Sequence, residues 1–310
     1  MRIAKTLIIA SLALVANLSF AQSTIKVKAN KAVKPLVEAW ANAYKQSHPG
    51  VTIEFVSKSS ESADLTYVSS KQEESLVAYV GRYALLPVTS SSNPLLEDLS
   101  KRNWSKGDIK KLYFSDAEEA FDEDSDVNEG RAGKLRGKLT VYSGSSSSSY
   151  SEAFAEFFGF SAGEIRGNKI AGDDLFLLSA VSRDAASITF NSIANIYDTN
   201  TRELKQNVVL LPLNVRKESV LALSSGNLDE AIAVLENTTS DLIPVEDFGF
   251  AYDSRSAEAK SFLEWIVSEG QSYNHDKGFL QLTSAEVALQ LNAFHGGISG
   301  SQFATNIAKR

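Results

Sequence analysis

The chain has 310 residues, 43% of them hydrophobic, which is enough for one large core or for two packed lobes. Its formal net charge is −7 and it has no basic stripe, so no nucleic-acid partner is expected. It contains no cysteine and three histidines. A disulfide framework is therefore excluded, few ligands remain for a transition metal, and we expect no cofactor.

Residues 1–21 have the pattern of a secretory signal peptide. Arg2 and Lys5 form a basic start, residues 7–15 form a short apolar run, and a small–x–small cleavage pattern ends at Ala21. The apolar run is too short to cross a bilayer, and no cysteine follows it that could carry a lipid. We therefore expect a periplasmic monomer that is not a lipoprotein.

The rest of the chain opens with a β–α–β pattern. Residues 25–28 alternate as a strand, residues 33–44 place apolar side chains at helical spacing, and residues 51–56 form a second strand. Such a unit predicts parallel strands. Strands are then expected at 65–68, 83–88, 139–142, 208–213 and 248–252, whereas residues 169–180 and 187–191 alternate between helix-like and strand-like patterns. Helices are expected at 108–113, 228–235 and 257–267, and a final helix is expected to be capped by Thr283 and Glu286. This alternation predicts an α/β fold.

Four of the predicted strands run into hydroxyl-rich loops at their C-terminal ends. These loops are residues 57–60, 69–70, 89–92 and 143–149. Ligands of open parallel sheets bind beyond the carboxyl ends of the strands. We therefore expect a shared ligand cleft, although serine is also common in loops that bind nothing.

The longest of these loops belongs to the stretch 137–159. A strand gives way to serines 145–149, and Ser149 and Glu152 have capping-box spacing, so a helix is expected to begin at Ser149. Gly159 stands where a glycine would end that helix. Free N–H groups at a helix start, together with hydroxyls, are suited to an oxyanion. A flexible serine linker is the alternative.

Residues 116–130 form a strongly acidic segment. They do not match a calcium-binding loop, because Val127 occupies the glycine position and Gly133 the final glutamate position. We interpret this segment as a solvated insertion, with weak divalent-ion binding as the alternative.

Several segments, in their order and spacing, resemble the phosphate-binding proteins of ABC transporters and, more broadly, the type II periplasmic solute-binding family. The resemblance is carried by residues 35–44 (PLVEAWANAY), 63–70 (ADLTYVSS), 80–96 (VGRYALLPVTSSSNPLL), 261–271 (SFLEWIVSEGQ) and 278–282 (GFLQL). It implies two α/β lobes, each a mixed sheet flanked by helices, joined by two crossing strands near residues 85–90 and 248–252. Lobe 1 would comprise residues 22–88 and 249–310, and lobe 2 residues 89–248.

The resemblance also implies a function. A small oxyanion, phosphate first, would be clamped between the lobes by hinge motion and handed to an ABC permease in the inner membrane, with no chemistry performed on it. Matched residue by residue, the family's ligand loops fall on Asn30, Lys31 and Ala32; on Ser59 and Ser60; on Ser69 and Ser70; and on Ser147, Ser148, Ser149 and Tyr150.

Two charged residues of the family pattern are missing from these positions. The aspartate that accepts the phosphate proton falls at Ser69 or Ser70, and the arginine falls at Gly144. Arginine supplies bidentate, charge-assisted bonds, so its loss should weaken anion binding or change the ligand. The departures also fit an alternative, in which a degenerate solute-binding fold serves regulation or scaffolding.

An exported serine hydrolase is a further alternative. Residues 159–163 match G-x-S-x-G around Ser161, and His275 and His295 follow in the chain. That motif requires a strand before the serine, whereas a helix is predicted here. Ser161 is better explained as a helix N-cap whose capping-box partner is Glu164.

Overall fold

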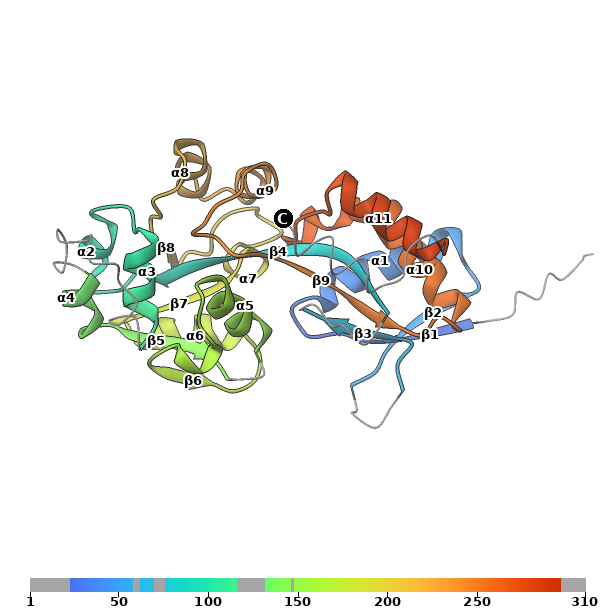
Figure 1. The fold of residues 1–310 in the computed structure, drawn as a ribbon, viewed down its shortest axis with the longest axis horizontal. Coiled ribbons are helices and arrows are strands. Elements are labelled where there is room, and N and C mark those ends of the chain that lie inside the picture. Colours follow the sequence, from blue (N-terminus) through green and yellow to red (C-terminus); the bar gives the residue numbers. More distant parts are fainter. Residues whose placement is uncertain (1–22, 58–61, 70–75, 116–131, 146–147, 297–310) are drawn as a thin grey trace, which may run out of the picture.

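The computed structural model describes residues 23–57, 62–69, 76–115, 132–145 and 148–296, which form two α/β lobes (Figure 1). The predicted signal peptide and the acidic insertion 116–130 lie outside these residues. Within the described ranges, none of the helices combines the length and the apolar character that crossing a membrane requires.

Lobe 1, on the right of Figure 1, contains a mixed sheet with helices along one side. Its strand β1 pairs in parallel with β2 and with β3, which confirms the predicted β–α–β unit. The elements are β1 (Ser23–Lys28), α1 (Lys34–Ser47), β2 (Val51–Phe55), β3 (Leu65–Val68), α10 (Ala257–Ser268), the 3-10 turns η2 (Gly270–Tyr273) and η3 (His275–Lys277), and α11 (Ser284–Phe294).

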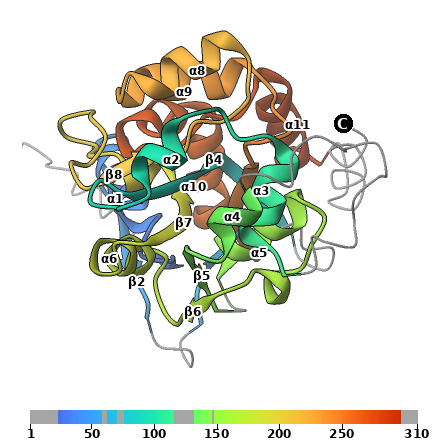
Figure 2. The ribbon, with the colours of Figure 1, turned by 90° about the vertical axis from the view of Figure 1, so that its left-hand side faces the viewer.

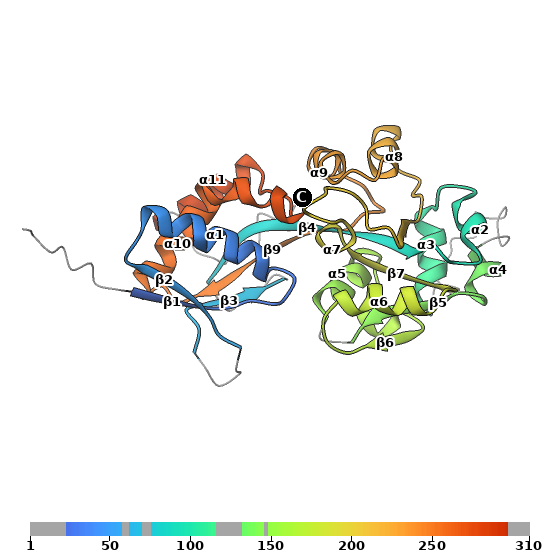
Figure 3. The same cartoon turned by 180° about the vertical axis from the view of Figure 1, so that it is seen from behind.

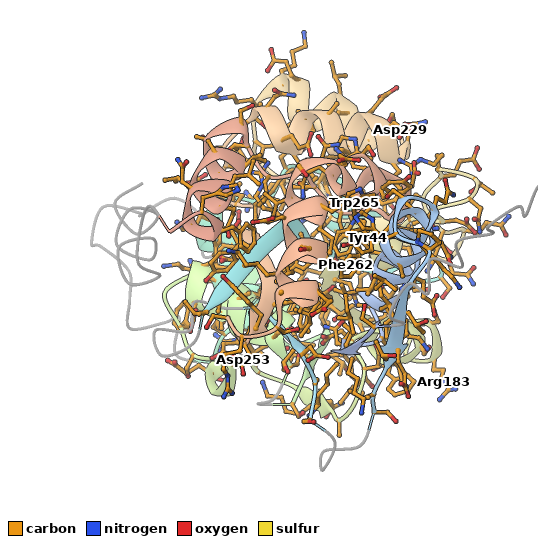
Figure 4. All side chains as sticks on the ribbon, turned by 90° about the vertical axis from the view of Figure 1, so that its right-hand side faces the viewer. Tyr44, Arg183, Asp229, Asp253, Phe262 and Trp265 are labelled. Atoms are coloured by element: carbon orange, nitrogen blue, oxygen red, sulfur yellow. The ribbon has the colours of Figure 1, made fainter. Side chains whose placement is uncertain are left out.

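Helix α1 shows how the sequence builds this lobe. Leu36, Val37, Trp40 and Tyr44 recur at helical spacing and are all buried, and each such side chain stabilises the fold by roughly 1.5–3 kcal/mol. Tyr44 packs edge-on against Trp265 of α10, with ring centroids 5.5 Å apart. Figure 4 shows these rings beside each other at the end of the lobe.

Lobe 2 contains a second set of strands surrounded by helices, as the end-on view in Figure 2 shows. Its core gathers phenylalanines; Phe154 of α5 stacks on Phe190 of β7 with centroids 3.9 Å apart. The elements are α2 (Leu96–Ser100), α3 (Lys106–Tyr113), α4 (Ala132–Arg136), β5 (Thr140–Gly144), α5 (Ser149–Phe157), η1 (Ala162–Glu164), β6 (Asn168–Ile170), α6 (Leu175–Arg183), β7 (Ser187–Ser192), α7 (Ile193–Ile196), β8 (Val208–Leu210), α8 (Lys217–Ser224) and α9 (Leu228–Asn237).

Two long strands, β4 (Val77–Ser90) and β9 (Val245–Tyr252), join the lobes. They pair with each other antiparallel from Val77–Ala251 to Ala84–Val245, and beyond that point β4 pairs with β7 and β8. The strand predicted over 83–88 is therefore longer than expected, because it serves both sheets. The lobe boundaries proposed from the sequence stay a prediction.

Two expectations about strand ends are corrected. β4 runs from lobe 1 to the far end of lobe 2 (Figure 3), so its hydroxyl loop 89–92 does not join the other loops at a cleft. Thr89 instead donates to Ser187 O (2.7 Å) and accepts from Asn93 (2.7 Å), which closes a turn. The buried strand predicted over 208–213 shortens to half-buried β8, which is followed by Pro212.

Candidate ligand-binding cleft

A cleft of about 350 Å³ lies between the two lobes. Lobe 1 contributes Asn30, Lys31 and Ala32, which connect β1 to α1; lobe 2 contributes Ser148 and Ser149 at the start of α5, and Gly172, Asp173 and Asp174 before α6. Three loops that are distant in the sequence thus meet at one place. A ligand held there would contact both lobes at once.

The structure brings together five of the residues predicted from the sequence: Asn30, Lys31, Ala32, Ser148 and Ser149. Ser69 lies beside the buried hydroxyl of Tyr67, and Tyr150 packs below the cleft. Ser59, Ser60, Ser70 and Ser147 lie outside the described residues. That any of these residues binds a ligand remains a prediction.

Helix α5 begins at Ser149 as predicted, but its N-cap is Ser148 rather than Ser149. The Ser148 hydroxyl accepts from Ser151 N (3.2 Å) and donates to Asp174 Oδ1 (2.6 Å), so it joins the helix start to the loop before α6. The predicted capping box between Ser149 and Glu152 is therefore wrong. Because Ser149 and Tyr150 are the first helical residues, their N–H groups have no acceptor within the helix. Gly159 follows the helix with φ +84°, as predicted.

Gly144 explains why no arginine stands at the end of β5. A Cβ atom at this position would lie 2.2 Å from Ser148 Cβ and 2.4 Å from Ser148 Oγ. The main chain of Gly144 also donates to Ser151 Oγ (2.8 Å). While Ser148 caps α5, position 144 has no room for any side chain.

Asp174 is a cleft residue that the sequence analysis missed. Burial raises the pKa of its carboxyl to about 6, partly opposed by the bond from Ser148 and reinforced by the charge of Asp173. Asn191 donates to its main-chain oxygen (2.7 Å) and fixes the loop. Its signal was present in the sequence, because Asp173 and Asp174 stand between a short strand and a helix, in the same setting as the serine loops.

Three tyrosines, Tyr67 of β3, Tyr83 of β4 and Tyr150 of α5, gather under the cleft. Their hydroxyl groups are buried and make no hydrogen bond of normal geometry with a described residue, although Ser192 lies close enough to Tyr150 to lower its pKa slightly. The rings of Tyr83 and Tyr150 lie 4.9 Å apart. Burial raises the pKa of all three phenols, so each stays a neutral donor. The side chains of Asn30, Ser149 and Ser69 surround the Tyr67 hydroxyl and oppose part of that rise in pKa.

The charges of the cleft are few. Of its described lining residues, Lys31 is the one cation, against Asp173 and Asp174. The Lys31 ammonium lies 5.7 Å from the ring centroid of Phe176 on α6, a cation–π contact that crosses from lobe 1 to lobe 2. The described lining contains two hydroxyl groups, those of Ser148 and Ser149, and one carboxyl group whose pKa is raised to about 6.

The hydrolase alternative finds no support in the contacts of Ser161. Its hydroxyl donates to Glu164 Oε2 (2.7 Å) within the predicted capping box, which the structure confirms. His275 pairs with Glu236 (2.8 Å), and His295 contacts Leu291 O (2.7 Å). No contact of Ser161 with a histidine occurs in the described part of the chain.

No protein-family model matches this chain, and no curated protein matches it in sequence. Solved structures do match. A putative phosphate ABC transporter substrate-binding protein from Clostridium perfringens, with bound phosphate, is 18% identical at a TM-score of 0.55, over 84% of this chain and 100% of that one. An ABC-type phosphate transport receptor from Vibrio cholerae is 13% identical at 0.53, with the same coverage.

A protein of another kind is also among the similar structures. The CcmR regulatory domain of Synechocystis PCC6803, solved with 2-PG, is 12% identical at a TM-score of 0.48, over 81% of this chain and 98% of that one. At these identities the likeness concerns the fold alone. Together with the two lobes and the two crossing strands, it shows that this chain has the type II periplasmic-binding-protein fold.

Proposed function

We propose that this chain is an exported solute-binding protein that captures a small oxyanion, most readily hydrogen phosphate, between its lobes and delivers it to an ABC permease of the inner membrane. The observation that carries the proposal is the meeting of residues 30–32, the start of α5 and Asp174 in one cleft, beside the buried hydroxyl of Tyr67.

Unpartnered buried hydroxyls favour an occupant rich in acceptor atoms. Each buried polar group left without a partner costs about 1–3 kcal/mol. The hydroxyls of Tyr67, Tyr83 and Tyr150 are in that state. An oxyanion accepts hydrogen bonds at every oxygen, so a bound oxyanion would offset part of this cost. It would also accept hydrogen bonds from the free N–H groups at the start of α5.

Asp174 selects for a protonated ligand. An ionised carboxylate only accepts hydrogen bonds, so the ligand oxygen that faces Asp174 must carry a hydrogen. Hydrogen phosphate has such a hydrogen. Sulfate is fully ionised at neutral pH, so its oxygen and the carboxylate oxygen of Asp174 would both be acceptors with no hydrogen between them. In this proposal Asp174 replaces, from the loop before α6, the aspartate that the family resemblance expected at Ser69 or Ser70.

Closure would occur about the crossing strands β4 and β9. With one wall of the cleft on each lobe, a ligand that bonds to both walls favours the closed arrangement by its differential affinity. The ammonium group of Lys31 would lie near the bound anion and attract it. Its contact with Phe176 would stabilise the closed arrangement of the lobes.

One observation favours the second candidate, a solute-binding fold used for regulation or scaffolding. The described lining of the cleft has more carboxylates than cations, and a site built to hold a dianion tightly would carry the reverse. In this case the cleft would bind no oxyanion.

The test is titration calorimetry on protein that has been unfolded, stripped of ligand and refolded, a procedure made simple by the absence of cysteine. We expect phosphate to bind at about pH 8 and sulfate to bind at least about tenfold more weakly. Asp174→Asn should remove most of this discrimination, since an amide can donate to sulfate. Asp173→Asn is the matched control and should keep it. Heat from neither anion would favour the regulatory or scaffolding role.

A further inference from the structure

A second cavity, of about 590 Å³, lies on the other side of the crossing strands. It is formed by Arg82 of β4, the end of α5, the residue before α8, and the segment that leads from α9 into β9. Its volume lies within the usual range of small-molecule sites. Figures 1 and 3 show α9 alongside β4 and β9 at the junction of the lobes.

This cavity and the cleft share none of their described lining residues. Tyr83 packs against Tyr150 under the cleft, so Arg82, its neighbour along the strand, points to the opposite face. Val245, which pairs with Ala84, lies on the same face as Arg82 and lines the cavity. A ligand in the cavity would therefore not compete for the cleft.

The cavity contains two guanidinium groups that form no direct ion pair with any described residue. Arg82 Nε donates to Gln281 O (2.8 Å), which fixes the plane of the group and leaves its terminal nitrogens available. Arg216, which precedes α8, is exposed. Within the described ranges, neither guanidinium lies within ion-pairing distance of a carboxylate.

The wall carboxylates do not cancel these charges by direct pairing. Glu236 Oε1 already accepts from His275 Nε2 (2.8 Å) and from Gln281 N (2.6 Å). Burial alone would raise the pKa of Glu236, but these two bonds and the charges of His275 and Arg82 lower it. The cavity therefore presents two guanidinium groups beside the carboxylates of Glu236 and Glu246.

The remaining walls are largely apolar. Phe157, Leu235, Ile243 and Val245 line the cavity beside the arginines. The nearby polar side chains are used locally: Thr238 donates to Val234 O (2.6 Å), and Asn237 donates to Ala233 O (2.7 Å). The lining therefore combines an anion-binding end with an apolar body.

We propose that this cavity is a second binding site, which takes a small organic carboxylate with an apolar body. Arg82 and Arg216 hold the carboxylate, because the planar fork of arginine matches its two oxygens. Phe157, Ile243 and Val245 enclose the body of the ligand. The site is independent of the cleft and of the ligand proposed for it.

Phenylacetate is the probe for this site, with phenylacetamide as its uncharged match. Titration followed by methyl NMR should shift the Ile243 and Val245 signals with phenylacetate, with or without phosphate present. Phenylacetamide should bind at least about tenfold more weakly, because it lacks a charge-assisted bond. Absence of these shifts, or equal shifts with the amide, would overturn the proposal.

Substitutions of Arg82 and Arg216 test whether these two side chains hold the carboxylate of the ligand. Arg216→Gln changes an exposed side chain, so the fold should be retained and phenylacetate affinity should fall about tenfold. Arg82→Gln should lower the affinity for phenylacetate by a similar factor. If Arg82→Gln fails to fold, the result for Arg216→Gln alone tests the proposal. Arg183→Gln, an exposed arginine on α6 outside the cavity, is the matched control and should bind as the native chain does. Native affinity in Arg216→Gln would contradict the proposal.

Discussion

The cleft and the second cavity share no described lining residue, and they offer different chemistry. The cleft has buried phenols and an aspartate whose pKa is raised to about 6. The cavity has two guanidinium groups and an apolar wall. Adjacent residues, Tyr83 and Arg82, belong one to each.

The comparison also shows why the arginine expected in the cleft is not found there. Ser148 folds back over Gly144 to cap α5, so that position cannot hold a side chain. The same cap orients Asp174. The geometry that supplies the carboxyl acceptor is therefore the geometry that excludes the cation.

The largest expected effect that tests this comparison is on Asp174. Its folded pKa, about 6, exceeds the ordinary 3.8, so ionisation weakens the native state, and the free energy of unfolding falls as pH rises between these values. The shift corresponds to about 3 kcal/mol. In ligand-free protein, Asp174→Asn should therefore be more stable than the native chain at about pH 8, less the cost of the altered bond to Ser148.

Urea unfolding across pH measures this effect. The advantage of Asp174→Asn should vanish at about pH 4, where the native carboxyl is protonated. Asp173→Asn, one residue earlier, is the control for removal of a charge from the same loop. If Asp174→Asn were less stable than the native chain at about pH 8, ionisation of Asp174 would not destabilise the folded protein as proposed.

The next effect concerns the room beside Ser148. Gly144→Ala should lower the free energy of unfolding by about 2 kcal/mol, because the added methyl group overlaps Ser148 and forces the loop to move. Phosphate affinity should fall with it. Gly133→Ala is the matched control: its Cβ meets nothing within 4 Å, and alanine favours the helix. If Gly144→Ala were neutral, the missing arginine would need another explanation.

The fold was predictable because its signals are local and periodic. The face of α1, the strand 65–68 and the capping boxes at Ser161 and Thr283 follow from spacing alone, and the structure confirms them. The direction of β4 was not predictable in this way. Whether a strand ends at a cleft or at the far end of a lobe depends on its partners, and these are distant in the sequence.

The cleft was predictable in part for the same reason. Residues 30–32 and 148–149 follow a strand or open a helix, and such positions suit a ligand. The choice of Ser148 over Ser149 as the cap depended on a bond to Asp174, which is 26 residues away. Tyr150 was expected at a ligand loop, whereas nothing local in the sequence indicated that the buried hydroxyls of Tyr67 and Tyr83 lack hydrogen-bond partners.

A smaller effect is expected for one of these phenols. Tyr67→Phe removes a hydroxyl that has no partner in the ligand-free protein, so the free energy of unfolding should stay the same or rise by up to about 1 kcal/mol. Phosphate affinity should fall about tenfold if the hydroxyl bonds to the ligand.

Tyr113→Phe is the matched control for that variant. The Tyr113 hydroxyl is buried but donates to Thr189 O (2.8 Å) in the core of lobe 2. Its removal should therefore destabilise the protein by about 1 kcal/mol and leave phosphate affinity unchanged. The same response from both variants would mean that Tyr67 is a packing residue.

The smallest expected effect is on Glu236, at the wall of the second cavity. Its lowered pKa means that the carboxylate stabilises the fold above its ordinary pKa of 4.5, and that this contribution is lost as pH falls through the lowered value. The pair with His275 is partly exposed, so Glu236→Gln should cost no more than about 0.5 kcal/mol at neutral pH. The glutamine oxygen still accepts from Gln281 N.

Removing a negative charge beside Arg82 should raise phenylacetate affinity severalfold, while phosphate binding in the cleft should not change. Glu230→Gln, on the exposed face of the same helix, should alter neither affinity. A gain in phosphate affinity in Glu236→Gln would show instead that the charge of Glu236 also weakens anion binding in the cleft.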